Sequence, residues 1–380
     1  MYELTQQRSQ QLRAFISELF VELPRSDQRR WATAYLEGLL ATPGKKTLRR
    51  IAATLGASPT ASQSLHQFVN ASPWGWEPVR DQLARWAAQH VNPDALVIDM
   101  AYIRKRGQQS CGVHTRYIPG QGKSGSCQLG VVAMLAGRQH IAPVDWALHL
   151  PGRWLDDEAG RSRAKIPASV TAKTTGQQAL ELVDARSHHL ASSLPVVGNF
   201  GSADEVASLA LGLTIRARDF VIAVPPTMPV QTERGRTTTA GQLWGRSRPS
   251  RAESRGTAWQ TAPPMMATAT VRVPVSNMPG PEYQLMTVRP SGGDRTAQLW
   301  LSNLTDRRRV YLLARRLEAS ARLISRLEEQ FGLADFEGRS YRGWHHYMTL
   351  VSAAYAWSEM SHMYEPANLS PSGDSENALR

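Results

Sequence analysis

The sequence contains very little cysteine. Among its 380 residues there are only two, Cys111 and Cys127. Two cysteines are too few for a disulfide framework, and these two lack the spacing of zinc ligands. Both are therefore expected to be small apolar residues in or beside a sheet.

Long apolar runs are also missing. No run approaches the roughly 18 apolar residues that a membrane-spanning helix requires. The first residues, MYELTQQRSQQ, lack the apolar region of a secretion signal. The sequence therefore predicts no membrane span and a cytoplasmic location. With 380 residues, 42% of them hydrophobic, the chain is long enough for a sizeable core and one or two accessory modules.

Positive charge, in contrast, is abundant. The chain has 44 Lys and Arg residues against 32 Asp and Glu residues, which gives a formal net charge of +12. A surplus of this size favours polyanionic partners, because each phosphate that is neutralised releases counterions. A soluble basic protein without a nucleic-acid partner would have the same composition, so charge alone leaves both interpretations open.

Three apolar segments predict a meander of antiparallel strands. The first runs from Ala95 to Ile98 and is followed directly by Asp99, and the other two are Cys127 to Ala136 and Ile141 to Leu150. A carboxylate at the end of a strand can face a cleft instead of the core. Asp99 is therefore a candidate site residue.

Two long motifs occupy the middle and the end of the chain. The first consists of GQQSCGVHTRYIPGQGKSGSCQLGVV, which begins at Gly107, and DWALHLPGRW, which begins at Asp145. The second is FEGRSYRGWHHYMTLVSAAYAW, from Phe336 to Trp357. In order and spacing they resemble the signatures of one branch of the bacterial insertion-sequence transposases of the DDE superfamily. The resemblance implies an α/β fold with an RNase H-like core, a mixed sheet flanked by helices, that acts on DNA.

The resemblance also implies where three metal-binding acids belong. Asp99 matches the first acid. In the family pattern Val-Val-Ala-Asp-Ala-Gly-Tyr-Gly-Asp the second acid falls on Asn199, while Asp204 still matches. Counting back 16 residues from Glu337 places the third acid at Ala321. The sequence thus retains only the first of the three acids.

These replacements bear directly on metal binding. An amide is neutral and offers one oxygen, and alanine offers none, so most of the affinity for divalent ions should be lost. Mg²⁺ or Mn²⁺ is therefore expected as a cofactor only if the chain is active. Glu318 is a candidate substitute for the third acid, and Asp99 and Asp204 are the candidate metal ligands.

Basic residues in three regions are candidates for contacts with DNA phosphates. The segment from Thr47 to Leu55, a turn at Gly56, and Ser64 to Val69 resemble a helix-turn-helix in outline. A packed helical cap, an ordinary hairpin turn and a surface loop would account equally well for the three basic regions. The candidates are Lys45, Lys46, Arg49 and Arg50 in the first region; Arg104, Lys105, Arg116 and Lys123 near Asp99; and Arg246, Arg248 and Arg251 around Trp244.

The predicted organisation has five parts. Residues 1–90 form a helical domain that is a candidate for DNA binding, and residues 91–225 form the first part of the core. A β-rich basic insertion at 226–305 is followed by helices at 306–365 that complete the core and by a disordered tail at 366–380. His345 and His346 lack nearby cysteine or acid spacing, so packing is favoured over metal binding.

The sequence therefore predicts a transposase-like protein that binds double-stranded DNA and lacks strand cleavage and transfer. Two alternatives stay open. One is an active transposase with relocated acids, and the other is a transposase scaffold recruited to a role without DNA, such as small-molecule chemistry. No membrane partner is expected, and a homodimer is compatible with the sequence.

Overall fold

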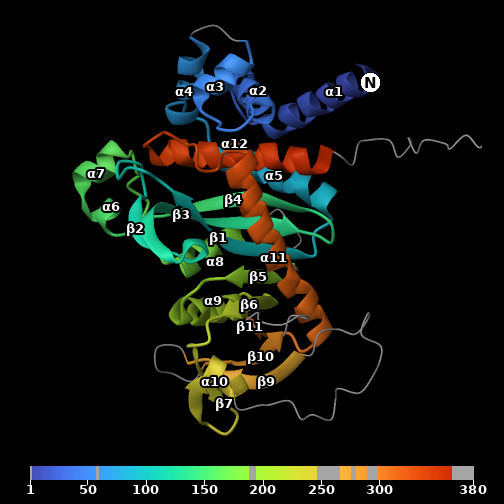
Figure 1. Cartoon of the computed structure of the whole chain (residues 1–380), viewed down its shortest axis with the longest axis vertical. Coiled ribbons are helices and arrows are strands. Elements are labelled where there is room, and N and C mark those ends of the chain that lie inside the picture. Colours follow the sequence, from blue (N-terminus) through green and yellow to red (C-terminus); the bar gives the residue numbers. More distant parts are fainter. Residues whose placement is uncertain are drawn as a thin grey trace, which may run out of the picture.

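The computed structural model describes residues 2–56, 60–187, 194–245, 266–274, 280–288 and 298–361 (Figure 1). The candidate DNA contacts Arg246, Arg248 and Arg251 and the predicted disordered tail lie outside these described residues. Within the described ranges, no helix is both long enough and apolar enough to cross a membrane.

One mixed sheet runs through the molecule. Its centre consists of β4 (Ile141–His149), β3 (Lys123–Ala136), β1 (Ala95–Arg104), β5 (Val196–Asn199) and β6 (Phe220–Val224). β1 and β4 both pair antiparallel with β3, as the three apolar segments predict, whereas β1, β5 and β6 are parallel. This strand order, flanked by helices, is the RNase H-like arrangement, so the predicted fold class is confirmed.

The composition of the central strands explains why both faces of the sheet are covered. Val, Ile, Leu and Ala dominate β1, β5, β6 and the second half of β3, and their side chains are almost completely buried. Such continuous apolar runs are typical of parallel strands with helices on both faces. Cys111 and Cys127 are buried free thiols, in agreement with the sequence.

Helices from distant parts of the chain pack on this sheet. α5 (Trp76–Val91) and α12 (Tyr341–Met360) lie against β4, α8 (Thr175–Ser187) against β3 and β4, and α9 (Ala203–Ile215) against β6. α11 (Arg307–Gln330) crosses β1, β5 and β6 (Figure 1). Asp306 caps α11 by accepting hydrogen bonds from the N–H groups of Arg308 and Arg309.

The N-terminal helices form a further layer on α12. α1 (Tyr2–Leu19), α2 (Ser26–Ala41), α3 (Leu48–Thr54) and α4 (Ala61–Asn70) lie beyond α12 as seen from the sheet (Figure 1). The segment that resembles a helix-turn-helix corresponds to α3 and α4, which pack against each other. α2 and α4 also contact α12, so this layer is continuous with the core.

The predicted β-rich insertion extends the central sheet. β11 (Gln298–Ser302) pairs antiparallel with β6, and β10 (Glu282–Val288), β9 (Met266–Arg272), β7 (Pro229–Thr232) and β8 (Thr237–Thr239) follow outward in that order. At the other edge, β2 (His114–Ile118) pairs with the start of β3. The short helices are η1 (Pro119–Gln121), α6 (Arg153–Asp156), α7 (Glu158–Arg163) and α10 (Ala240–Gly245).

Candidate metal centre and nucleic-acid interface

Asp99 lies where parallel strand pairing ends. β1 pairs with β5 as far as Ile98 and Gly198, but it continues its antiparallel pairing with β3 to Arg104. Asp99 is therefore inside a strand, not at the strand end that the sequence suggested, because β3 is long enough to pair with the whole of β1. The next residue of β5 after the last parallel pair is Asn199, so Asp99 and Asn199 occupy adjacent positions on neighbouring strands.

The Asp99 carboxyl group is held by two hydrogen bonds. Ser320 on α11 donates from its hydroxyl to Oδ2 at 2.6 Å, and the N–H of Met100 donates to Oδ1 at 2.8 Å. Only 9% of Asp99 is exposed. Burial raises the pKa of Asp99 to about 6, and the two hydrogen bonds oppose this rise without cancelling it. The group is therefore a poorly solvated single carboxyl.

On α11 the residue that contacts Asp99 is Ser320, one position before Ala321. Ala321 and Glu318 are both exposed. An α-helix turns by about 100° per residue, so Ala321 projects about 100° and Glu318 about 160° away from Ser320. The side chain of α11 that faces Asp99 is therefore that of Ser320, and Glu318 is on nearly the opposite side of the helix.

Asp204, the other candidate metal ligand, is exposed in the first turn of α9. Its neighbour Glu205 accepts hydrogen bonds from the hydroxyls of Ser202 and Thr175 and belongs to the cap of that helix. In the part of the chain that the structure describes, no three His, Cys, Asp or Glu side chains form a group that could hold a metal ion.

The donor set around Asp99 does not fit a pair of divalent cations. Asp99, Asn199 and Ser320 together offer one carboxylate, one amide and one hydroxyl. Mg²⁺ and Mn²⁺ favour anionic oxygen ligands, and two such ions in a shared site need several carboxylates to balance their charge.

The predicted phosphate contacts differ in how accessible they are. Arg116 is half-buried, and its guanidinium lies 5.4 Å from the centre of the Tyr102 ring. Five other candidates are exposed: Lys45, Arg49, Arg50, Arg104 and Lys123.

Two of the predicted lysines have a different role. Lys46 is buried, and its ammonium donates to the carbonyl oxygens of Leu39 and Thr42 at the end of α2. Lys105 donates from Nζ to Phe336 O at 2.7 Å and to a second carbonyl next to it, and burial lowers the pKa of this lysine to about 8. Both ammonium groups already donate to carbonyl oxygens, so Lys46 and Lys105 are less available to a phosphate than the exposed candidates are.

A basic surface that the sequence analysis did not single out lies on α11. Arg308, Arg315 and Arg322 are all exposed, and they recur every seven residues. Two helical turns separate successive members, with a drift of only about 20° per heptad, so the three side chains follow one side of the helix. We call them the α11 arginine row. Their seven-residue spacing was the signal that could have revealed them.

Other arginines of α11 are already paired. Arg309 forms an ion pair with Asp219, Arg316 with Asp94, and Arg326 with Glu359. Within the described residues, no ion pair involves a member of the α11 arginine row. The row therefore presents three positive charges that are available to an external anion.

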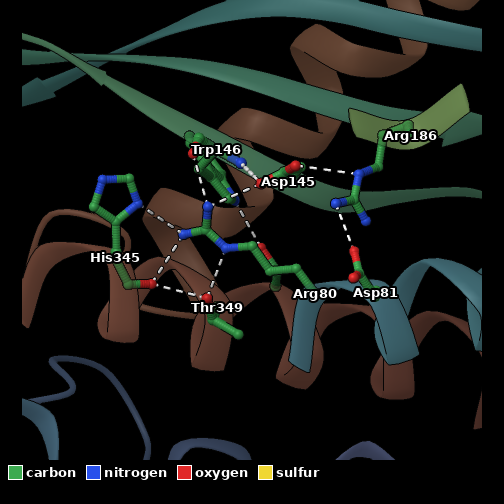
Figure 2. A network of polar contacts seen from close by, with 8 residues as sticks. Arg80, Asp81, Asp145, Trp146, Arg186, His345 and Thr349 are labelled. Atoms are coloured by element: carbon green, nitrogen blue, oxygen red, sulfur yellow. Dashed lines mark hydrogen bonds and ion pairs between the residues drawn. The ribbon is translucent and has the colours of Figure 1, made fainter. Parts of the chain in front are cut away.

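The Asp145-Trp146 motif belongs to a buried ion network (Figure 2). Asp145 Oδ1 lies 2.9 Å from Arg80 Nη1, and its Oδ2 lies 3.1 Å from Arg186 Nε. Arg186 Nη2 is 2.7 Å from Oδ1 of Asp81. Arg80 also donates from Nη2 to His345 O at 3.0 Å. The network joins α5, β4, α8 and α12, and so ties the first motif to the second.

His346 is buried beside the network and packs as predicted. Its ring stacks on Trp74, with ring centres 3.7 Å apart. The two ring nitrogens each lie 2.8 Å from a carbonyl oxygen, those of Val69 and Trp74. This histidine therefore links α12 to the last turn of α4 and to the loop that follows it.

Comparison with known protein families gives one match. The sequence model of the family described as DDE superfamily endonuclease matches residues 18–274, about two-thirds of the chain. The match includes β1 and β5, which carry Asp99 and Asn199, and it ends before α11. No curated protein matches the chain.

Proposed function

Because the chain belongs to the DDE superfamily of endonucleases, we propose that it is a transposase-derived protein that binds double-stranded DNA without cutting or joining its strands. The observation that carries this proposal is the composition of the centre formed by Asp99, Asn199 and Ser320. Its three positions supply one ionisable oxygen ligand.

The loss of cleavage follows from charge. Transfer of a phosphoryl group by two metal ions depends on carboxylates that hold both ions and set their separation. One carboxylate provides a single negative charge against the four positive charges of two divalent ions. The Asp99 carboxyl is also desolvated, and both of its oxygens already accept hydrogen bonds. A metal would have to compete with Ser320 for the same oxygen.

The α11 arginine row supports the binding of DNA. From Arg308 to Arg322 the helix rises by about 21 Å. That length corresponds to about six base pairs of B-form DNA, at 3.4 Å per phosphate along one strand. Ser320 and Arg322 are two residues apart on α11, so the row reaches the level of the Asp99 centre. Arg322 projects about 160° away from Ser320 around the helix, so a duplex that follows the row would be separated from this centre by α11.

Two measurements on the purified full chain test the proposal. Fluorescence anisotropy with a labelled duplex, repeated at increasing salt, measures the association constant. The logarithm of this constant should fall linearly with the logarithm of the salt concentration. Incubation of the same preparation with supercoiled plasmid and Mg²⁺ or Mn²⁺ should give no nicked product.

The variant Asp99→Ala is the control for contaminating nucleases. Nicking that is present in the natural chain and lost in Asp99→Ala would show that cleavage survives, and it would support the alternative with relocated acids. Absence of duplex binding at low salt, by a folded protein, would instead reject the DNA-binding half of the proposal and favour a recruited scaffold.

A further inference from the structure

The helix α4 stands between two hollows of the N-terminal helical layer. The first hollow lies between the start of α3 and α4, and Ser62, Gln63 and His66 line it from α4. The second hollow lies between α2, α4 and the segment 71–73, and Ser64 and Gln67 line it from α4. Since residues of α4 border a different hollow on each side, the helix forms a ridge. Figure 1 shows this ridge at the outer edge of the layer, away from the central sheet.

The exposed face of the ridge contains hydrogen-bonding groups but no charge. The apolar side chains of α4 pack on α2, α3 and α12, whereas Gln63, His66 and Gln67 are exposed. At about 100° per residue, these three side chains fall within an arc of about 100°. Among the helices of eight or more residues in the described ranges, α4 alone has no Asp, Glu, Lys or Arg. Helix faces that only meet water usually carry such charges. A neutral face of this kind therefore suits a polar partner.

Amide and imidazole groups are suited to base edges. A glutamine side chain can accept from N6 and donate to N7 of adenine at the same time, and an imidazole N–H can donate to N7 of a purine. These edges are accessible in the major groove, which is about 12 Å wide and admits one α-helix. From Gln63 to Gln67 the helix rises by about 6 Å. This rise corresponds to about two base-pair steps of about 3.4 Å each.

Cations lie on both sides of the ridge. Lys45, Arg49 and Arg50 are exposed at the start of α3, and Arg49 lines the first hollow. On the other side, the exposed guanidinium of Arg30 lies 5.0 Å from the ring centre of Trp31, which lines the second hollow. A helix in the major groove has one phosphate backbone on each side, so positive charge on both flanks matches double-stranded DNA. In a helix-turn-helix the second helix of the pair takes this place, and α4 follows α3.

Two carboxylates also line the hollows. Asp27 is paired with Arg25 at 2.8 Å at the second hollow, so this pair adds no net charge. Glu337 is exposed and lines the first hollow, and no ion pair within the described residues involves it. A phosphate beside Glu337 would be repelled. The backbone on this side should therefore follow the cations of α3 and stay away from Glu337.

We propose that α4 enters the major groove of a DNA duplex and reads its sequence, with Gln63, His66 and Gln67 on base edges and the cations of α2 and α3 on the two phosphate backbones. This inference rests on the proposed DNA binding and adds sequence preference to it. The α11 arginine row supplies phosphate contacts, which carry no sequence information. Because glutamine pairs best with adenine, the preferred site should contain A·T pairs at two positions.

The test starts from a pool of duplexes randomised over about ten base pairs, one turn of the double helix. Repeated rounds of binding to the full-length protein and amplification should enrich a motif with two such A·T pairs. Anisotropy then compares the enriched duplex with a scrambled duplex of the same composition. Gln63→Ala and Gln67→Ala should each weaken binding to the enriched duplex by about 5- to 100-fold, and each should change binding to the scrambled duplex by less than about twofold.

Gln89→Ala is the matched control, because it removes an exposed glutamine from another helix, α5. It should change neither affinity by more than about twofold. Thermal unfolding of each variant shows whether the chain is still folded. A preference that is lost in Gln63→Ala and Gln67→Ala and kept in Gln89→Ala supports the proposal.

The other outcomes separate this inference from the proposed function. If the protein binds every duplex equally well, or if Gln63→Ala and Gln67→Ala keep the full preference, the reading of sequence by α4 is overturned while DNA binding stands. If the folded protein binds no duplex even at low salt, the proposed function fails, and the inference that rests on it fails as well.

Discussion

The hydroxyl of Ser320 donates a 2.6 Å hydrogen bond to the carboxylate of Asp99 and so joins α11 to β1. The same hydroxyl lies 2.7 Å from the carbonyl oxygen of Leu317. A hydroxyl has one proton, so Ser320 can donate to only one of these acceptors at a time. Which of the two acceptors receives the hydrogen bond depends on whether Asp99 is charged. The contact between α11 and β1 therefore depends on pH.

Ser320→Ala should destabilise the protein more at pH 8 than at pH 5. At pH 8 the charged Asp99 loses a charge-assisted hydrogen bond, which costs about 1.5–3 kcal/mol. At pH 5 Asp99 is largely protonated in the folded protein, and the cost falls to about 1 kcal/mol. Urea unfolding of the natural chain and of Ser320→Ala at both pH values measures the change in unfolding free energy. Ser325→Ala, at an exposed position of α11, is the control, and an equal cost for Ser320→Ala at both pH values would contradict the coupling.

Asp99→Asn should become more stabilising, relative to the natural chain, as pH rises. The pKa of Asp99 is about 6 in the folded protein against an ordinary value of 3.8. Between these values the folded state binds more protons than the unfolded state, so the stability contributed by Asp99 is lost as pH rises from 4 to 6. The amide of an asparagine does not titrate, so the variant loses no stability over this pH range. The difference in unfolding free energy should rise by about 2.4 kcal/mol between pH 4 and pH 7; a constant difference would show that Asp99 is not desolvated.

Asn199→Asp combined with Ser320→Glu should restore binding of Mn²⁺. These two positions adjoin Asp99 in space, so the double variant places three carboxylates around one point. Asn199→Asp with Ala321→Glu carries the same charge but directs the glutamate about 100° away around the helix. Electron paramagnetic resonance of free Mn²⁺ and thermal shifts at rising Mn²⁺ should show binding by the first variant only. Equal binding by both would mean that the rotation of α11 is not fixed.

Asp145→Ala should be severely destabilising. The change leaves the buried guanidinium groups of Arg80 and Arg186 without their shared carboxylate, and breaking a buried pair in this way costs about 3–5 kcal/mol. The exposed pair of Arg25 and Asp27, with side chains 65% and 49% exposed, is the contrast. Asp27→Ala should cost far less stability in the same urea unfolding experiment, because solvent screens an exposed ion pair.

The triple variant Arg308→Gln, Arg315→Gln and Arg322→Gln should weaken duplex binding at every sequence tested. Each arginine that touches a phosphate contributes about one unit to the slope of log affinity against log salt, so the slope should fall by about three. The control removes the same charge from α1, α5 and α7 through Arg13→Gln, Arg85→Gln and Arg163→Gln, which are exposed and not aligned. An equal loss in both triple variants would indicate a general charge effect instead of a surface on α11.

The strands were predictable because their signal is local. The apolar runs at Ala95–Ile98 and Ile141–Leu150 have the length and composition of buried strands, and each forms one. The residue of α11 that contacts Asp99 was not predictable in the same way. A count along the chain that is off by one residue rotates a helical side chain by about 100°, and only the packing of α11 on β1 selects Ser320 over Ala321.

Other roles depend on residues that are far apart in the chain. Lys46 belongs to a sequence that reads as an exposed basic turn, yet its N–H is bound by Asp335 and its ammonium by carbonyls of α2. Arg80 and His345, which are 265 residues apart, become neighbours only after α5 and α12 pack on β4. No local pattern carries such information, since burial and pairing are decided by the assembled core.

The pairing of β11 with β6 has a consequence for how this fold can vary. After Val224 the chain makes an excursion into the outer strands β7, β8, β9 and β10 of the same sheet, and β11 then lies beside β6, where Leu299 pairs with Val224. The hydrogen bonds between β6 and β11 thus hold the two ends of this excursion together. Related chains could lengthen, shorten or replace the excursion during evolution while α11 keeps its position over Asp99, so diversity among relatives should concentrate there.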